Sequence, residues 1–419
     1  MSPATSTEGR PTLAARPASL PRLLPPASAT LNLAGHLARY GNLPPVAPGL
    51  IAVVERSGLR GRGGAGFPTA RKLAAVTAET HGRPGRAVVV ANGAEGEPAS
   101  GKDRTLLALS PHLVLDGVAV AVAALGATEA FVCVDEGARA AQRALAAALA
   151  ERTDAVAVRL VTVPSRYVAG EETALVNWLN GGAAKPTFVP PRPFQRGVHG
   201  RPTLIDNVET LAHLALIARY GDDWFRSVGS DAVAGSMLVT VSGAVPRPGV
   251  LEAAPGTGLG ELVAAAGGPS EALSAVLLGG CFGTWMEPTA AWGRNLDLTV
   301  GAGIVVAFPA SACGLAEVAR LARWLAGQSA GQCGPCVNGL PAIADGVDAL
   351  MRGRASAEVV ANLKRRLALV PGRGACHLPD GATRVVASGL NLFSAEIQAH
   401  AAGRCTATRR GPVLPFPVG

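Results

Sequence analysis

An alternation of strand-like and helix-like stretches in the first half of the chain most constrains how it can fold. Three short apolar stretches, each containing valine, are typical of buried strands: 87–91, 130–134 and 157–163. Apolar helical patterns at 111–125 and 136–151 separate them. Because strands that alternate with helices form a parallel sheet covered by helices, the sequence predicts an α/β domain.

A different pattern begins near residue 231. The stretches 236–243 and 249–252 have the composition of two strands joined by a proline-containing turn, and a short helix at 260–266 and a strand at 275–279 follow. This order of strand, turn, strand, helix and strand predicts a small β-grasp-like module.

The last part of the chain is helical in pattern. Four amphipathic segments are separated by loops: 315–327, 340–351, 356–369 and 385–401. Amphipathic helices joined by short loops pack as neighbours, so the sequence predicts a helical bundle.

Two of these loops contain cysteines that one metal centre could bring together. Cys333 and Cys336 have C-x-x-C spacing, which places both sulfurs on one side of a tight turn, and Cys376 lies two helical segments further on. From the residues alone, the spacing fits a zinc ion, a redox dithiol or an iron–sulfur cluster. Cys405 is a candidate additional ligand. The other cysteines are expected in core or loop positions: Cys133, Cys281 and Cys313.

Length, charge and apolar content exclude several classes of protein. A chain of 419 residues is too long for a single core. Its net charge of +8 comes from dispersed basic residues, which argues against nucleic-acid binding. No stretch is apolar enough for a membrane span, and the cysteines fit a reducing compartment. We therefore expect a cytoplasmic protein, free or peripheral to a membrane complex, with a disordered tail at 1–44 and a further tail at 406–419.

A glycine-rich stretch precedes the first predicted strand. Four glycines occupy positions 61–66, which lets backbone N–H groups approach a phosphate or a flat ring, and Arg62 and Lys72 add positive charge. The pattern formally matches G-x-G-x-x-G, but the strand that should precede it is missing. A flexible surface loop is the alternative interpretation.

Acidic side chains follow the first strand and open a later helix. Asn92, Glu95 and Glu97 come directly after 87–91, at the strand end where α/β sheets bind ligands. Glu171 and Glu172 lie in the first turn of a helix near 174–179. They suit either a flavin or ribose contact or the helix dipole, and Glu95 and Glu97 suit either a ligand or a polar turn.

Taken in order, these stretches resemble the flavoprotein subunit of respiratory complex I, NADH:quinone oxidoreductase. Five motifs occur in the family's order: 57–69, 92–104, 170–175, 200–211 and the cysteine loop at 329–336. The resemblance implies a Rossmann-like FMN-binding α/β domain, a ubiquitin-like β-grasp insert and a four-helix iron–sulfur bundle. The implied boundaries are 45–230, 231–312 and 313–405. In that family NADH passes a hydride to FMN, and electrons leave singly through a [4Fe-4S] cluster.

The resemblance also implies roles for particular residues. FMN and NADH would contact Gly61, Arg62, Gly64, Phe67, Lys72, Asn92, Gly170, Glu171, Glu172 and Asn207. Glu95 and Glu97 would lie by the flavin and nicotinamide as the catalytic pair, and Phe67 would stack on the dinucleotide. The cluster ligands would be Cys333, Cys336 and Cys376.

Departures from the family pattern fall on the cluster and the NADH site. The family's first cluster cysteine is Ala330 here, so three thiolates remain for a [3Fe-4S] cluster, or for a [4Fe-4S] cluster with another fourth ligand. An aspartate is replaced by Ala94, aromatic residues after Lys72 are absent, and Arg192 stands where a phenylalanine is usual. Each lost contact is worth about 1 kcal/mol. FMN binding is therefore expected to be better preserved than NADH binding.

Three functional hypotheses remain from the sequence. The first is an electron-transfer oxidoreductase that uses FMN and an iron–sulfur cluster, with NADH as the default donor and a ferredoxin-like or quinone-reductase-type subunit as partner. The second is a non-catalytic assembly or binding subunit that kept the fold. The third is a zinc-stabilised α/β protein.

Overall fold

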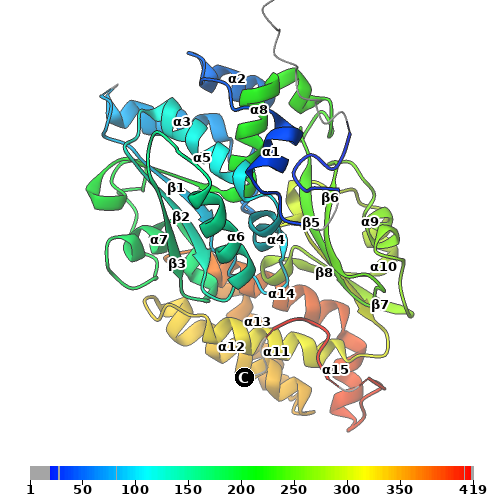
Figure 1. Ribbon diagram of the computed structural model, residues 1–419. Coiled ribbons are helices and arrows are strands. Elements are labelled where there is room, and N and C mark those ends of the chain that lie inside the picture. Colours follow the sequence, from blue (N-terminus) through cyan, green and yellow to red (C-terminus); the bar gives the residue numbers. More distant parts are fainter. Residues whose placement is uncertain (1–18, 27–28, 82, 410, 417–419) are drawn as a thin grey trace, which may run out of the picture.

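The computed structural model describes residues 19–26, 29–81, 83–409 and 411–416. Figure 1 shows two sheets side by side, with the helices of the C-terminal part packed beneath them. The first sheet has the strand order β3-β2-β1-β4, and the second has the order β6-β5-β9-β7-β8.

The first sheet is parallel throughout, as the alternating pattern predicts. Its strands are β1 (Val88–Gly93), β2 (Glu129–Asp135), β3 (Val158–Val163) and β4 (Thr203–Asn207). The strand β4 was missed by the sequence analysis, because its five residues end in the polar Asp206 and Asn207 and run directly into a helix.

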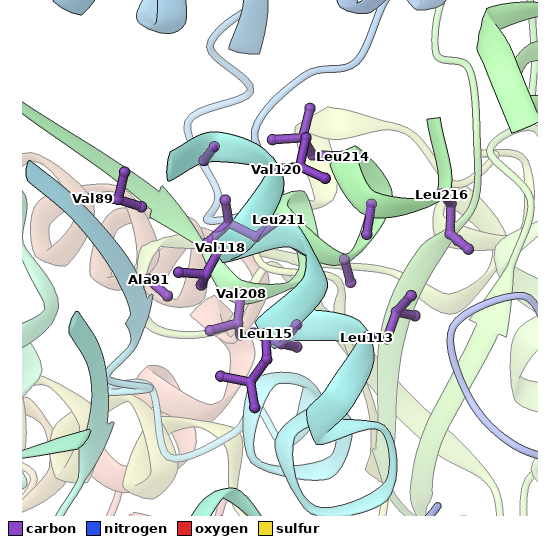
Figure 2. Packing of buried hydrophobic residues seen from close by; sticks show 14 of the residues in the cluster. Val89, Ala91, Leu113, Leu115, Val118, Val120, Val208, Leu211, Leu214 and Leu216 are labelled. Carbon is purple, nitrogen blue, oxygen red and sulfur yellow. The ribbon is translucent and has the colours of Figure 1, made fainter. Parts of the chain in front are cut away.

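Helices cover both sides of this sheet. They are α2 (Leu50–Ser57), α3 (Thr69–Thr80), α4 (Lys102–Leu109), α5 (Pro111–Leu125), α6 (Arg139–Ala150), α7 (Glu172–Leu179) and α8 (Val208–Arg226). In Figure 2, Leu115 and Val118 of α5 and Leu211 of α8 lie beside Ala91 of β1. A Cβ atom on Gly117 would lie 2.0 Å from the Leu211 carbonyl oxygen, so glycine lets the two helices approach. Each fully buried valine or leucine here contributes roughly 1.5–3 kcal/mol.

The described part of the predicted N-terminal tail is folded, so that prediction was wrong beyond residue 18. It contains α1 (Leu33–Tyr40), whose Tyr40 is buried in the core. Arg22 is also buried and donates to the Trp224 carbonyl oxygen at 3.1 Å, with its guanidinium over the Trp224 ring. A few anchors therefore hold a segment whose proline- and alanine-rich composition indicates disorder. Residues 1–18, 27 and 28 lie outside the described residues.

The second sheet confirms the predicted β-grasp-like module. Its strands are β5 (Met237–Gly243), β6 (Gly249–Ala253), β7 (Leu273–Leu278), β8 (Thr284–Met286) and β9 (Ile304–Pro309). Two short helices, α9 (Leu259–Ala265) and α10 (Pro288–Trp292), accompany it. The central strand β9 is parallel to β5 and antiparallel to β7. The sequence analysis missed it, since its residues are part of the longer apolar stretch 298–316.

The C-terminal helices are α11 (Gly314–Gly327), α12 (Leu340–Met351), α13 (Ala357–Leu369), α14 (Leu378–Leu392) and α15 (Ser394–Ala401). The predicted fourth segment, 385–401, is in fact two helices that meet at Phe393. Phe393 packs against Trp285 and Phe308 of the second sheet, with ring centroids 5.3 and 5.9 Å away. Short helical turns accompany these elements: η1 (Tyr167–Gly170), η2 (Val198–Gly200), η3 (Gly280–Phe282), η4 (Leu298–Val300) and η5 (Pro335–Gly339).

The described part of the predicted C-terminal tail is also packed against the protein. Leu414 and Phe416 are buried, and Arg320 of α11 donates to both of their carbonyl oxygens, at 2.6 and 2.8 Å. The prediction of a tail over 406–419 is therefore wrong for residues 411–416. Among the described residues, no single helix has the length and apolar composition of a membrane span; α4 and α5 meet that test only as a pair bent by 96°.

Candidate functional site

The glycine-rich loop lies between α2 and α3 and is closed by a bridge between Arg60 and Pro68. The Gly61 N–H donates to the Phe67 carbonyl oxygen at 2.8 Å. Gly64 and Gly66 have φ angles of +103° and +60°, which favour glycine. A Cβ atom on Gly63 would lie 3.4 Å from the Asn207 Cβ, so the loop reaches the carboxyl end of the first sheet.

The middle of this loop can bind an anion. The hydrogen bonds that the described residues make to the loop fall at its two ends, and the N–H groups of Gly63, Gly64 and Gly66 have no partner among them. Successive free N–H groups form a concave site for a phosphate. Lys72, one helical turn into α3, donates to the Ile205 carbonyl oxygen at 2.9 Å and supplies a positive charge nearby. The loop therefore fits the phosphate end of FMN.

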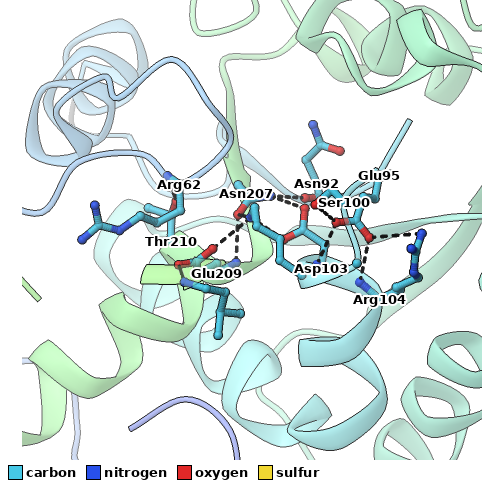
Figure 3. A network of polar contacts seen from close by, with 12 residues as sticks. Arg62, Asn92, Glu95, Ser100, Asp103, Arg104, Asn207, Glu209 and Thr210 are labelled. Atoms are coloured by element: carbon cyan, nitrogen blue, oxygen red, sulfur yellow. Dashed lines mark hydrogen bonds and ion pairs between the residues drawn. The ribbon is translucent and has the colours of Figure 1, made fainter. Parts of the chain in front are cut away.

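Arg62 is placed differently from the other predicted residues of the loop. Its guanidinium donates to the Ala234 carbonyl oxygen at 2.8 Å, and its side chain is buried. Figure 3 shows this side chain directed away from Asn207. Its backbone N–H donates to the Thr210 hydroxyl at 2.9 Å. Arg62 thus joins the loop to the segment before β5.

The end of β1 is fixed to the turn η1. The Asn92 side-chain amide donates to the Gly170 carbonyl oxygen at 2.8 Å and accepts from the Ala94 N–H at 3.1 Å. A Cβ atom on Gly170 would lie 2.5 Å from the Ala94 carbonyl oxygen, so this approach requires glycine. The structure therefore brings the predicted residues Asn92 and Gly170 together.

Glu95 turns toward the start of α4. It accepts hydrogen bonds from the Ser100 hydroxyl at 2.5 Å and from the Asp103 N–H at 3.1 Å. Burial, followed by the negative charge of Asp103, raises the pKa of the Glu95 carboxyl group.

Glu97 contacts the second sheet instead of an open site. Its carboxylate accepts from the Cys281 N–H at 2.7 Å and the Cys281 thiol at 3.2 Å, and from the Ala99 N–H at 3.1 Å. Burial raises the pKa of this carboxyl group. Cys281 and Cys133 are fully buried, which confirms their predicted core positions.

A buried polar network that the sequence analysis missed supports Asn207 (Figure 3). Lys102 Nζ lies 2.7 Å from Asp103, 2.9 Å from Glu209 and 3.1 Å from the Asn207 amide oxygen. The Asn207 amide also donates to Asp103 at 2.8 Å. Burial alone would lower the pKa of Lys102, but Asp103 and Glu209 hold it above its ordinary value. Because these four polar side chains satisfy one another's hydrogen-bonding groups, Asn207 is held rigidly beside the glycine loop.

The acidic pair at the start of α7 divides into two roles. Glu171 caps the helix, because its carboxylate accepts the N–H groups of Thr173 and Ala174, each at 3.0 Å. These hydrogen bonds agree with the alternative interpretation from the sequence, in which the Glu171 carboxylate stabilises the helix dipole. Glu172 is partly exposed and lies 3.8 Å from the guanidinium of Arg192.

Phe67 is 48% exposed, so its ring is available to a ligand. The roles proposed for these residues in FMN and NADH binding stay predictions. A cavity of about 340 Å³ beside α7 contains none of the predicted site residues; among its lining residues are Asn177, Phe188 and Arg196.

The three predicted cluster cysteines are neighbours. The pKa of the Cys376 thiol is raised to about 11, mainly by burial and then by Cys336, Glu171 and Cys333. Within the described chain, these three sulfurs do not form a group with every ligand atom within 4.8 Å of the others. Ala330, at the position of the family's first cluster cysteine, is 4% exposed.

One short segment connects the two candidate sites. The Tyr167 N–H donates to the side chain of Gln328 at 3.0 Å, and Arg166 donates to the Ser329 carbonyl oxygen at 3.4 Å, next to the cysteine loop. Three residues further on, Gly170 accepts from Asn92 at the end of β1. The Tyr167 ring lies between Phe282 and Trp324, with centroid distances of 4.8 and 5.7 Å.

Comparison with known families matches all three regions. Residues 54–216 match the Nuo51 FMN-binding domain, residues 238–279 the SLBB domain, and residues 316–400 the NADH-ubiquinone oxidoreductase-F iron–sulfur binding region. The fold and these matches define a flavin- and iron–sulfur-binding subunit of the complex I type.

The similar proteins identify the family. The chain is 33% identical to an NADH-quinone oxidoreductase-F protein of Rhizobium meliloti over 82% of its length and 86% of that protein. It is also 33% identical to the NADH-quinone oxidoreductase-F protein of Mycobacterium tuberculosis, over 82% of this chain and 83% of that protein. The chain belongs to the NADH-quinone oxidoreductase-F family, which confirms the resemblance.

A solved structure extends the comparison. The crystal structure of an NAD⁺-reducing [NiFe]-hydrogenase in the H₂-reduced state matches with a TM-score of 0.77 and 31% identity. The match covers 85% of this chain and 63% of the hydrogenase chain, so this protein corresponds to just under two thirds of that chain.

Proposed function

We propose that this protein is an FMN-dependent NADH dehydrogenase-like subunit that passes electrons to an iron–sulfur cluster and then to a partner protein. Family membership supports the reaction class. The observation that carries the proposal is segment 166–171, which contacts both the end of β1 and the cysteine loop. Because segment 166–171 contacts both candidate sites, it would keep them close, as single-electron transfer between them requires.

The chain's residues would bind and orient the flavin. The free N–H groups of Gly63, Gly64 and Gly66, with the charge of Lys72, would hold the phosphate. Asn207 would lie beside the ring system, fixed by Lys102. When bound, FMN supplies the chemistry that links a two-electron donor to a one-electron acceptor.

The two predicted catalytic carboxylates would have different tasks. Glu95 lies at the strand end, where it would contact the flavin or nicotinamide by exchanging its hydrogen bond from Ser100 or Asp103 for one with the ligand. Glu97 is a positioning residue, since Cys281 and Ala99 already engage its carboxylate. Phe67 would stack on the dinucleotide. Arg62 would act through the backbone of the loop that it anchors.

The cysteine loop would hold the cluster with three thiolates, from Cys333, Cys336 and Cys376. Binding to iron offsets the negative charge of these thiolates, which suits side chains in a partly buried setting. Ser329 lies in the same loop. Burial raises the pKa of the Cys336 thiol, and a hydrogen bond with the Ser329 hydroxyl opposes this shift. The cluster would be [3Fe-4S], or [4Fe-4S] with a fourth ligand other than cysteine.

Anaerobic purification, a UV–visible spectrum and quantification of FMN and iron on one sample test this proposal. We expect one flavin and about three or four irons per chain. Addition of NADH should then bleach the flavin band. Flavin that an excess of NADH leaves oxidised would disprove NADH as donor.

The second candidate function is a non-catalytic assembly subunit. The replacement of a cluster cysteine by the buried Ala330 favours it. Purified protein without flavin or iron, after cofactor reconstitution has been attempted, would establish this function and exclude electron transfer.

The expected partner is a further electron-transfer subunit, of the ferredoxin-like or quinone-reductase type. The relatives are named as subunits, which supports an assembly of several chains. A cytoplasmic location, free or peripheral to a membrane complex, is part of the same proposal. Co-purification of a tagged chain with its neighbours in the native host tests both points.

A further inference from the structure

A second group of metal-ligand side chains lies at the far end of α11 from the cysteine loop. The ligand atoms of Cys313, His400 and Cys405 all lie within 4.8 Å of one another. Cys313 Sγ lies 3.4 Å from His400 Nε2 and 3.2 Å from a carboxylate oxygen of Glu396. Because α11 has 14 residues, its length of about 20 Å separates this group from the cluster cysteines.

The hydrogen bonds of His400 orient it as a ligand. Its Nδ1 lies 2.6 Å from the Met351 carbonyl oxygen. A carbonyl oxygen can only accept, so Nδ1 carries the proton and Nε2 presents its lone pair to Cys313. A backbone carbonyl on the other ring nitrogen is the usual support for a metal-bound histidine.

The chain on both sides of Cys405 is fixed. Before it, Gly403 has a φ of +70° and the Arg404 N–H donates to the Ala399 carbonyl oxygen at 2.9 Å. After it, the N–H groups of Thr408 and Arg409 donate to the Ser311 carbonyl oxygen at 2.9 and 2.8 Å. Ser311 is two residues from Cys313, so these bonds bring the two cysteines together. Cys405 is therefore directed to Cys313 and not to the cluster loop, where it was a candidate extra ligand.

The geometry of the group fits a tetrahedral zinc ion. Zinc bonds of about 2.3 Å to sulfur and about 2.0 Å to nitrogen place the ligand atoms roughly 3.5–4 Å apart. The Cys313–His400 distance of 3.4 Å is close to this spacing. The side chains of Cys313 and His400 are partly buried, and that of Cys405 is exposed.

We propose that Cys313, His400 and Cys405 bind one zinc ion. The ion would join the start of α11 to the end of α15 and to the segment after it. Two thiolates and an imidazole are ligand types that zinc prefers, and a water molecule would complete the four-coordinate shell.

Metal analysis of the full-length chain tests the proposal. The protein, treated with reductant and chelator and then given zinc, should retain about one zinc per chain after desalting. Cobalt added in place of zinc should give the visible bands of tetrahedral thiolate coordination. A reduced wild-type protein that retains no zinc would overturn the proposal, and a Cys313–Cys405 disulfide would then explain the proximity of the two sulfurs.

Matched variants locate the ion. His400→Asn and Cys405→Ser should weaken zinc binding by at least about 10–100-fold, whereas His199→Asn, a substitution of an exposed histidine elsewhere, should leave it unchanged. Cys333→Ser should remove iron and keep the zinc. Zinc that disappears in Cys333→Ser but persists in Cys405→Ser would place the metal at the cluster loop and refute the site. Circular dichroism confirms that each variant is folded.

Discussion

The flavin region and the cysteine loop are built on opposite principles. Around the glycine loop, backbone N–H groups would provide the proposed anion site, and the buried network of Lys102, Asp103 and Glu209 fixes Asn207 beside it. The cysteine loop depends on three side-chain sulfurs, and one substitution has already removed a fourth ligand position. A site made by the backbone tolerates sequence divergence, whereas a site made by a few atoms does not.

The largest effect is expected at the cysteine loop. Cys333→Ser should reduce the iron content to near zero while the flavin content stays at the wild-type level, because only two cysteine ligands would remain. Iron analysis and flavin fluorescence on the same preparation measure both. Simultaneous loss of flavin would contradict this expectation, since it would show that the flavin region depends on the cluster.

A buried charge cluster behind the flavin region should control its stability. Asp116 of α5 contacts His36 at 2.7 Å, Arg219 at 2.5 Å and Arg152 at 2.8 Å. Asp116→Asn leaves two buried arginines without this partner, so the free energy of unfolding should fall by about 3–5 kcal/mol at neutral pH. Urea unfolding measures the change, and Asp222→Asn, in the exposed pair with Arg56, is the control that should change little.

The same variant predicts a pH dependence. Burial alone would raise the pKa of Asp116, but His36, Arg219 and Arg152 hold it well below its usual range. Its contribution to stability is therefore present above the unfolded-state pKa of about 3.9 and is lost as the pH falls. The difference between wild type and Asp116→Asn should shrink on acidification. A difference that grew below about pH 4 would contradict this assignment.

Gly170→Ala should have an intermediate effect. The new Cβ atom would lie 2.5 Å from the Ala94 carbonyl oxygen, so the end of β1 and η1 must separate. We expect a stability loss of about 1–3 kcal/mol and weaker flavin retention. Gly249→Ala, where a Cβ atom meets nothing within 4 Å, is the matched control. Unchanged flavin content in Gly170→Ala would show that this close contact does not position the site.

The smallest change should come from restoring a cysteine. Ala330→Cys would supply the family's missing ligand, so the iron content should rise from about three to about four per chain. Iron analysis and electron paramagnetic resonance distinguish the two cluster types. Identical iron content in both proteins would indicate that another side chain already serves as fourth ligand.

Periodicity predicted most of the first sheet, because β1, β2 and β3 are continuous apolar runs between helices. It missed β4 and β9, whose ends are polar or merge into neighbouring apolar residues. Sequence motifs also identified Asn92, Gly170 and Asn207, which the structure gathers at one edge. They could not show that Glu97 binds Cys281, since the two residues are 184 positions apart. Long-range partners of this kind depend on how the domains dock, which local patterns do not encode.

Segment 166–171 links the retention of the two cofactors. Because this segment contacts both the strand end and the cysteine loop, filling either site restricts the freedom of a wall that the other site shares. Thermodynamic reciprocity then requires that the flavin change cluster retention by the same factor by which the cluster changes flavin retention. The expected retention of flavin in Cys333→Ser sets this factor near one, so a chain that lacks its cluster should hold its flavin as tightly as the fully loaded chain.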